Sequence, residues 1–280
     1  MILVIGSNGM LGRDLMELLG NRACGVDIGE IDITSMDSVM QVLHLMKPET
    51  VINCAAITDV DGCESNAERA MEVNGEGVGY LALACREIGA LLVQVSTDYV
   101  FDGSKGTPYV EDDTPHPLSV YGESKLAGEM NAALNPEHLI VRTQWLYGLH
   151  GKNFVETMLR LAADKNELTV VDDQTGSPTW TIDLAKAIVA LVDKGLRGTY
   201  HVANADFCSW NGFARAIFDG AGLTVSVKPM TTVELNRPAR RPLYSTLDCG
   251  KLSRDAGFLM QSWRNALQEY MQLRSTRKDT

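Results

Sequence analysis

The sequence is poor in the residues that usually bind metals. It has five histidines and six cysteines in 280 residues, and neither type recurs at the short, paired spacings of zinc ligands. We therefore expect no metal site. Cys54 and Cys85 lie in apolar stretches, and we expect both to be reduced residues of the core.

Basic charge is also scarce. Lys and Arg together number 25 against 36 Asp and Glu, which gives a net charge of −11 and an isoelectric point near 4.9. A surface of this sign repels the phosphates of nucleic acids and of anionic membranes, so we expect neither as a partner. A local basic loop can still bind an anionic substrate.

Long hydrophobic runs are absent as well. No apolar stretch reaches the roughly 18 residues that a membrane-spanning helix requires. The first predicted strand starts at Ile2 with no basic leader or cleavage region before it, so we expect no signal peptide. Together with reduced cysteines, these features predict a cytoplasmic protein that contacts no membrane.

The apolar residues, 45 % of the chain, follow an alternating pattern of strand and helix over the first 145 or so positions. Strands are predicted at 2–5, 23–27, 50–54, 91–96 and 138–142. Helices are predicted at 11–20, 35–46, 67–88 and 119–134. The third strand is almost continuously apolar, as expected for a parallel strand covered on both faces. The pattern predicts an α/β fold with a doubly wound parallel sheet of the Rossmann type.

The second half of the chain has a looser pattern. Helices are predicted at 152–164, 179–194, 209–221, 248–256 and 262–273, with strands at 168–171 and 199–203, a loop at 229–242 and a polar tail at 275–280. We expect a dinucleotide-binding domain at 1–148 and a smaller α/β substrate-binding domain at 149–280, partly interleaved with the first.

A glycine-rich loop opens the chain. Gly6, Gly9 and Gly12 lie between the first predicted strand and the first predicted helix. Glycines allow the backbone to turn tightly and to approach a pyrophosphate, whose charge is stabilised at the helix N-terminus. Because the triplet stands between strand and helix, it favours a dinucleotide-binding loop over an ordinary tight turn.

Two further segments are predicted to contact the dinucleotide. Asp27 lies 21 residues after Gly6, where an acidic group would meet the ribose hydroxyls. Asp27 favours an unphosphorylated ribose, whereas Arg13 could accept a 2′-phosphate, so both NADH and NADPH stay open. Ala55 and Ala56 follow the third strand, and their small side chains either leave room for a nicotinamide or simply pack in the core.

The candidate catalytic residues are Thr97, Tyr121 and Lys125. A Tyr and a Lys four residues apart share one helix face, and a nearby cation lowers the pKa of a phenol. Thr97 ends a buried-looking strand and can hold an oxygen beside the phenol. Each residue alone has an ordinary structural explanation, but the three together after a glycine-rich loop predict proton transfer to a carbonyl or from an alcohol.

Two other features are open to alternative interpretations. Trp145 follows a strand and could stack on a sugar or base, or it could be a core residue. Arg237, Arg240 and Arg241 gather in one loop, where they could bind a diphosphate or be merely solvated. Asn74, within the helix predicted at 67–88, either bonds to the backbone of a neighbouring strand or is exposed.

These motifs resemble those of the extended short-chain dehydrogenases/reductases and, more narrowly, of the dTDP-4-dehydrorhamnose reductase family. The resemblance covers almost the whole chain. It rests first on the glycine loop, on Ser-Thr-Asp-Tyr-Val-Phe at 96–101 and on Tyr-Gly-x-x-Lys at 121–125. Further matching stretches lie at 53–61, 142–148, 153–155, 172–179 and 237–248.

The resemblance implies that hydride from NADPH or NADH reduces a dTDP-4-dehydro-6-deoxy-L-mannose to dTDP-L-rhamnose. Tyr121 would protonate the developing alkoxide, Lys125 would lower the phenol's pKa and hold the nicotinamide ribose, and Thr97 would bond to the sugar oxygen. Asp98 and Trp145 would contact the nucleotide sugar, with Arg237 as a further candidate. Other residues implied to line the cofactor are Asn8, Gly9, Met10, Asp27, Asp32, Ile33, Cys54, Ala55 and Ala56.

The sequence departs from the family in two places. Some members form Mg²⁺-bridged dimers through acidic side chains. Here Asp14 holds the early position, but no matching acidic pair is evident in the second half, so we predict no metal and leave a homodimer open. The Arg240-Arg241-Pro242 stretch also replaces residues that are more commonly polar.

Two other functions compete with reduction. An epimerase of the same superfamily would keep its cofactor bound, whereas a 4,6-dehydratase would need Glu where Tyr99 follows Asp98. A non-catalytic regulatory subunit like the methionine adenosyltransferase beta subunit shares much of the pattern. Intact Thr97, Tyr121 and Lys125 favour catalysis over that alternative.

Overall fold

A six-stranded parallel sheet forms the centre of the protein, whose computed structural model describes residues 1–278. The strands follow the order β10-β5-β4-β3-β1-β2, and every neighbouring pair runs parallel. They are β1 (Ile2–Ile5), β2 (Ala23–Val26), β3 (Thr50–Asn53), β4 (Leu91–Thr97), β5 (His138–Thr143) and β10 (Gly198–His201). The predicted doubly wound sheet is confirmed.

The strand order reverses between β1 and β3. The chain passes from β1 outward to β2 and then returns to β3 on the opposite side of β1. Loops that leave the carboxyl ends of such neighbouring strands diverge, and doubly wound proteins bind their ligands in the crevice between them. This topology places the loop after Ile5 opposite the segment after Asn53.

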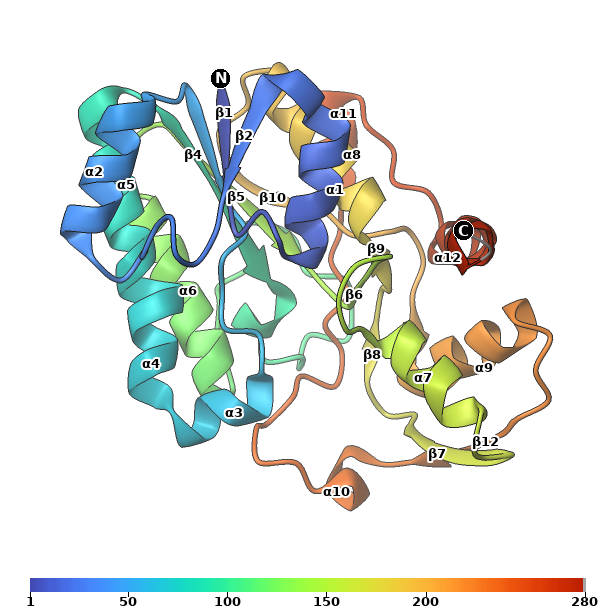
Figure 1. The fold of residues 1–280 in the computed structure, drawn as a ribbon. Coiled ribbons are helices and arrows are strands. Elements are labelled where there is room, and N and C mark those ends of the chain that lie inside the picture. Colours follow the sequence, from blue (N-terminus) through green and yellow to red (C-terminus); the bar gives the residue numbers. More distant parts are fainter. Residues whose placement is uncertain (279–280) are drawn as a thin grey trace.

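Helices cover both faces of the sheet (Figure 1). One face packs against α1 (Met10–Leu19), α8 (Thr181–Asp193) and α11 (Gly250–Ala256). The other packs against α2 (Met36–Met46), α5 (Gly77–Ile88) and α6 (Val120–Ala132). The first-half strands and helices agree with the predicted ones to within a few residues.

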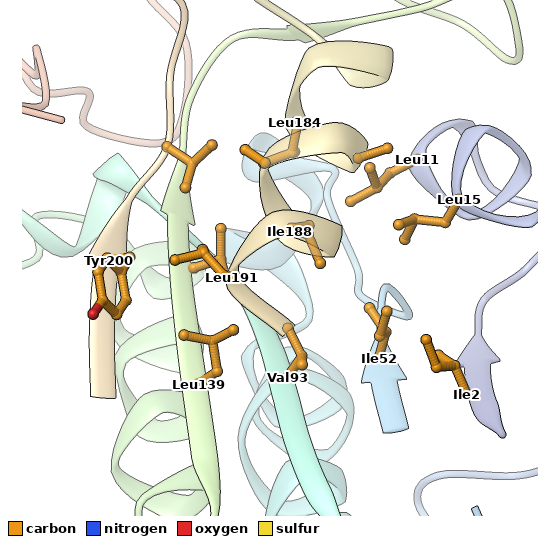
Figure 2. Packing of buried hydrophobic residues seen from close by; sticks show 14 of the residues in the cluster. Ile2, Leu11, Leu15, Ile52, Val93, Leu139, Leu184, Ile188, Leu191 and Tyr200 are labelled. Atoms are coloured by element: carbon orange, nitrogen blue, oxygen red, sulfur yellow. The ribbon is translucent and has the colours of Figure 1, made fainter. Parts of the chain in front are cut away.

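The core on the α8 face illustrates how the apolar pattern builds this layer. Leu184, Ile188 and Leu191 are spaced four and three residues apart, so they share one side of α8. All three are fully buried and belong to one cluster with Val93 and Leu139 of the sheet (Figure 2). Burial of each such side chain stabilises the fold by roughly 1.5–3 kcal/mol.

The helix predicted at 67–88 is divided into three parts. It consists of α4 (Ala67–Met71), the π-helical turn η2 (Glu72–Glu76) and α5. Wide turns of this kind often occur at functional sites. A short helix that the sequence did not reveal, α3 (Val60–Ser65), precedes it, and its N-cap Asp59 accepts a bond from the Gly62 N–H.

The second half builds a smaller α/β layer. Its core contains α7 (Phe154–Ala162), α9 (Trp210–Gly220), α12 (Trp263–Lys278) and the parallel pair β7 (Glu167–Val171) and β12 (Ser226–Met230). Two-residue strands form the pairs β6 (Leu146–Tyr147) with β9 (Thr179–Trp180), and β8 (Thr175–Gly176) with β11 (Cys208–Ser209). The short strands and β12 were missed because their pairing partners lie far away in sequence.

Two predictions for the second half need correction. The segment 229–242 is not wholly a loop, because it includes the end of β12 and helix α10 (Thr232–Leu235), which Thr231 and Glu234 cap reciprocally. Residues 275–278 belong to α12 rather than to a tail, and the last two positions of that predicted tail lie outside the described residues.

The two halves of the chain share their cores. Strand β10 and helices α8 and α11 come from the second half, yet they pack with the first. The boundary at 148 stays a prediction. Within residues 1–278 the structure holds no helix with the length and apolar character needed to cross a bilayer.

Candidate active site

The glycine loop fits its surroundings only as glycine. Gly6 has a φ of +76°, and a Cβ there would lie 2.8 Å from the backbone nitrogen of Ala55. A Cβ on Gly12 would lie 2.2 Å from the carbonyl oxygen of Gly6. The loop after β1 therefore touches the segment after β3 at the point where the strand order reverses.

Helix α1 begins directly from this loop. Its N-cap is Gly9, and no described side chain caps it with a hydrogen bond. The N-terminus of a helix carries partial positive charge and backbone N–H groups that suit an anion. Together with the tight glycine turn, this end of α1 fits a pyrophosphate group.

A cavity of about 660 Å³ lies at the same edge of the sheet. Its lining includes most of the predicted cofactor residues: Gly6, Gly9, Asp27, Asp32, Ile33, Cys54, Ala55 and Ala56. Asn8, Met10 and Gly12 belong to the loop and α1 but do not line it, and neither do Tyr121 and Lys125. The residues that line the cavity include members of the segments that follow β2 and β3.

The acidic residues at this cavity are tied to the backbone. One oxygen of Asp27 accepts from the Asn8 N–H and the other from the Ile28 N–H, both at 2.8 Å. Hydrogen bonds from the side chain and backbone of Thr34 lower the pKa of Asp32. Arg13 donates to the Asn8 carbonyl at 3.1 Å, so a cation lies beside the same loop.

The three candidate catalytic residues come from one strand end and one helix. Thr97 is the last residue of β4, while Tyr121 and Lys125 occupy successive turns of α6. The Lys125 ammonium donates to the Val95 carbonyl at 2.7 Å, which holds α6 against β4. All three side chains belong to buried residues, so their polar atoms face little water.

Burial controls the protonation of this group. It raises the pKa of Tyr121 above its usual value, and a hydrogen bond with Thr97 partly offsets the rise. Burial also lowers the pKa of Lys125 to about 8, against the opposing influence of Glu129. At neutral pH Tyr121 is thus a protonated donor beside a cation. Lys125 is not among the larger influences on the Tyr121 pKa, whereas the sequence suggested a lowering by Lys125.

Asp98 lies behind Thr97. Its side chain accepts from the Thr97 hydroxyl at 3.0 Å and from the Ser245 hydroxyl on its other oxygen. Burial raises the pKa of Asp98 to about 6, although these hydrogen bonds oppose the rise. The sequence did not reveal Ser245, because it lies 147 residues from its partner.

Asn74 connects the cofactor edge to the catalytic helix. From the π-helical turn η2, its side chain exchanges two hydrogen bonds with the backbone of Ile57, at 2.8 and 3.0 Å. It also donates to the Ser124 hydroxyl at 3.1 Å. Asn74 is therefore buried and bonded to backbone rather than exposed, but its partner Ile57 lies in the segment after β3 and not in a strand, as the sequence had suggested.

Trp145 stacks on another indole. Its ring lies 3.6 Å from that of Trp210 at an angle of 10°, and its backbone has a φ of +47°. A Cβ on Gly176 would lie 2.5 Å from the Trp145 indole, so glycine makes room for it. The partial exposure of Trp145 contrasts with the fully buried Trp180 and Trp263, which places it outside the core.

The arginine loop is partly occupied by an internal contact. Arg241 pairs with Asp61 at 2.9 Å, and Arg237 approaches the same carboxylate at 3.7 Å. The Arg237 side chain is 57 % exposed, whereas that of Arg241 is 15 % exposed. A diphosphate contact stays a prediction for Arg237. The guanidinium of Arg241 is paired with Asp61 instead.

Comparison with known proteins identifies the family. The model of the RmlD substrate binding domain matches residues 1–275. The chain belongs to this family. A dTDP-4-dehydrorhamnose reductase of Streptomyces griseus is 46 % identical over 278 residues, covering 95 % of this chain and 91 % of the relative.

Two further relatives of this RmlD-family chain bear on ligands. The crystal structure of dTDP-4-dehydrorhamnose reductase from Bacillus anthracis in complex with NADP has a TM-score of 0.95 and 40 % identity. The aligned region covers 97 % of this chain and 98 % of the Bacillus anthracis chain. A dTDP-4-keto-6-deoxy-D-glucose reductase of Streptomyces niveus is 40 % identical, with 95 % of this chain and 94 % of the relative covered.

One group of side chains in the RmlD-family fold has the composition of a metal site. Asp14 and Glu17 on α1 and His150 offer ligand atoms within 4.8 Å of one another. The sequence expectation of no metal interpreted His150, like the other histidines, as structural or exposed, and it found no acidic pair in the second half to match Asp14. That no metal binds stays a prediction.

Proposed function

We propose that the protein is a reductase that uses NADPH or NADH to convert dTDP-4-dehydro-6-deoxy-L-mannose, also called dTDP-4-dehydrorhamnose, to dTDP-L-rhamnose. The observation that carries the proposal is the intact group of Thr97, Tyr121 and Lys125 in a chain that matches a named reductase over nearly its full length. The same group disfavours a non-catalytic regulatory role.

The residues at the cofactor edge suit a nicotinamide dinucleotide. The glycine turn leaves backbone N–H groups near the start of α1, and the 660 Å³ cavity extends from Asp27 to Ala56. The NADP-bound relative of 40 % identity supports the same assignment. When bound, the reduced nicotinamide would supply a hydride to the keto carbon of the sugar.

Tyr121 is proposed as the proton donor. Its raised pKa keeps the phenol protonated at neutral pH, which suits the protonation of an alkoxide. The neighbouring Lys125 cation stabilises the phenolate that forms as the proton leaves. Because Val95 holds the ammonium in place, this charge is organised before the reaction begins.

Thr97 is proposed to hold the sugar oxygen beside the phenol. Its hydroxyl donates to Asp98 and its oxygen accepts from the Tyr99 N–H at 3.2 Å, so the side chain has a fixed orientation. Asp98 is 1 % exposed, so its proposed role is to orient the Thr97 hydroxyl rather than to contact the sugar directly. Trp145 and Arg237 are proposed contacts of the nucleotide sugar.

We also propose a cytoplasmic location, supported by the acidic surface and by free cysteines throughout the described chain. A homodimer is compatible with the family but rests on no interface in this structure. Nucleotide-sugar binding is the partner interaction on which the proposed reaction depends.

The proposal is tested by following the absorbance of reduced nicotinamide with a panel of 4-keto nucleotide sugars. We expect oxidation of NADPH or NADH that requires dTDP-4-dehydrorhamnose, with dTDP-L-rhamnose as the product. The panel includes dTDP-4-keto-6-deoxy-D-glucose, because a relative is named for that substrate. Absence of turnover with every sugar would contradict a reductase, and a cofactor that stays bound through purification would favour an epimerase.

A further inference from the structure

The segment 237–248, here called the strap, crosses the catalytic region. It leaves the second half after α10 and passes beside α3 before reaching α11 (Figure 1). Its Ser245 bonds to Asp98, and Tyr109 exchanges backbone bonds with Thr246 and Asp248 at 2.9 and 2.8 Å. The strap therefore lies against the end of β4, which carries Thr97.

An ion pair anchors the first part of the strap. The Arg241 guanidinium donates to both oxygens of Asp61, at 3.1 and 2.9 Å, and also to the Ala239 carbonyl at 2.9 Å. The Ala239 N–H donates back to Asp61 at 3.2 Å. Two residues 180 positions apart are thus joined by the fixed geometry of one guanidinium.

This ion pair reaches the catalytic tyrosine through two contacts. The Arg241 guanidinium interacts with the Tyr99 phenol, whose ring packs edge-on against Tyr121 with centroids 5.4 Å apart. Asp61 belongs to α3, whose Cys63 packs in the same buried cluster as Tyr121. Tyr99 and α3, which both belong to the cluster around Tyr121, are therefore attached to the ion pair.

We propose that Asp61 and Arg241 are positioning residues for the reductase, which hold Tyr99 and α3 so that the Tyr121 ring keeps one orientation in the active site. This inference rests on the proposed function. Neither side chain is assigned contact with the sugar or the cofactor. If the Tyr121 phenol is no longer held in one orientation, the rate of proton transfer should fall steeply, because small displacements of a reacting group slow the reaction strongly.

Geometry distinguishes this role from simple attachment of the strap. Lys in place of Arg241 keeps a positive charge near Asp61, but it cannot donate to both Asp61 oxygens in parallel from one planar group. Arg274 and Glu156 provide a matched control. They form a partly buried pair in which two guanidinium nitrogens donate to two carboxylate oxygens, away from Tyr121.

The test compares Arg241→Lys with Arg274→Lys in the full chain. We expect Arg241→Lys to lower kcat about tenfold or more while the KM for NADPH changes less than about twofold. Arg274→Lys should leave kcat within about twofold of the wild-type value. Melting temperatures measured in parallel report the stability cost of each change.

Two further variants test the other residues of the proposed arrangement, Asp61 and Tyr99. Asp61→Asn should lower kcat in the same way as Arg241→Lys, and it replaces that variant if the lysine protein does not fold. Adding Tyr99→Phe to Arg241→Lys should lower kcat by less than the product of the two single effects. Equal kcat values for the Arg241 and Arg274 variants, or independent effects of Arg241 and Tyr99, would overturn the inference. Absence of wild-type turnover would instead reject the proposed function.

Discussion

The Lys125 ammonium group donates a hydrogen bond to the backbone carbonyl of Val95, with 2.7 Å between the two atoms. Val95 precedes Thr97 by two residues on β4, and Lys125 follows Tyr121 by one turn of α6. This contact joins the strand and the helix that carry the proposed catalytic residues. It also keeps a cation in a buried place, where its charge costs free energy.

The pH dependence of catalysis should report Lys125. Burial lowers its pKa to about 8, so the ammonium is charged below that pH and neutral above it. Because this charge is proposed to stabilise the phenolate of Tyr121 as the proton leaves, kcat/KM should fall as the pH rises through about 8. Lys125→Arg keeps its charge at higher pH and should lose this decline, although its maximal rate is lower. A pH–rate profile of the wild type and of Lys125→Arg measures this decline. If the Arg variant shows the same decline, titration of Lys125 is not its cause.

The glycine loop offers a prediction with a close control. Gly6→Ala should weaken NADPH binding at least about tenfold, because the added Cβ meets the Ala55 backbone at 2.8 Å and the residue has a positive φ. Gly195 also has a positive φ, +66°, but nothing lies within 4 Å of its Cβ position. Gly195→Ala should cost stability of about 1–3 kcal/mol and leave NADPH affinity unchanged. Fluorescence titration with NADPH compares the two, and equal losses of affinity would show that the close approach to Ala55 is unimportant.

The buried ion pair that joins the catalytic helix α6 to β5 should matter for stability. Arg142 donates to both oxygens of Glu129 at 2.9 and 2.8 Å, and the two side chains are 6 % and 5 % exposed. Arg142→Met would leave the Glu129 carboxylate without its cation and should lower the free energy of unfolding by about 3–5 kcal/mol.

The exposed pair of Arg197 and Glu137 is its control, and Arg197→Met should cost no more than about 1 kcal/mol. Urea unfolding of both variants measures the difference. Equal costs for the two substitutions would mean that burial of Arg142 adds nothing to the strength of its ion pair.

The fold and part of the site could be predicted because their signals are local. Gly6 stands between a strand and a helix, and Tyr121 and Lys125 are separated by one helical turn, so a short window of sequence contains each pattern. The order of β1, β2 and β3 follows from the same alternation, since right-handed crossovers allow few arrangements.

The remaining features depend on distant residues. Asp61 and Arg241 are 180 residues apart, and neither is unusual in its own segment. Ser245 bonds to Asp98 only because the strap returns to the end of β4. Strand β10 could be expected as a strand, but its place beside β5 depends on packing of the whole second half. No periodicity or turn signal reports such contacts.

Tyr121→Phe tests the central claim most directly, since it removes one hydroxyl and keeps the ring against Tyr99. Steady-state kinetics with dTDP-4-dehydrorhamnose should show kcat lowered by about two orders of magnitude or more, because the proton donor is gone. NADPH affinity, measured by titration on the same preparation, should be unchanged. A variant with the wild-type kcat would contradict the account, because Tyr121 would then not deliver the proton.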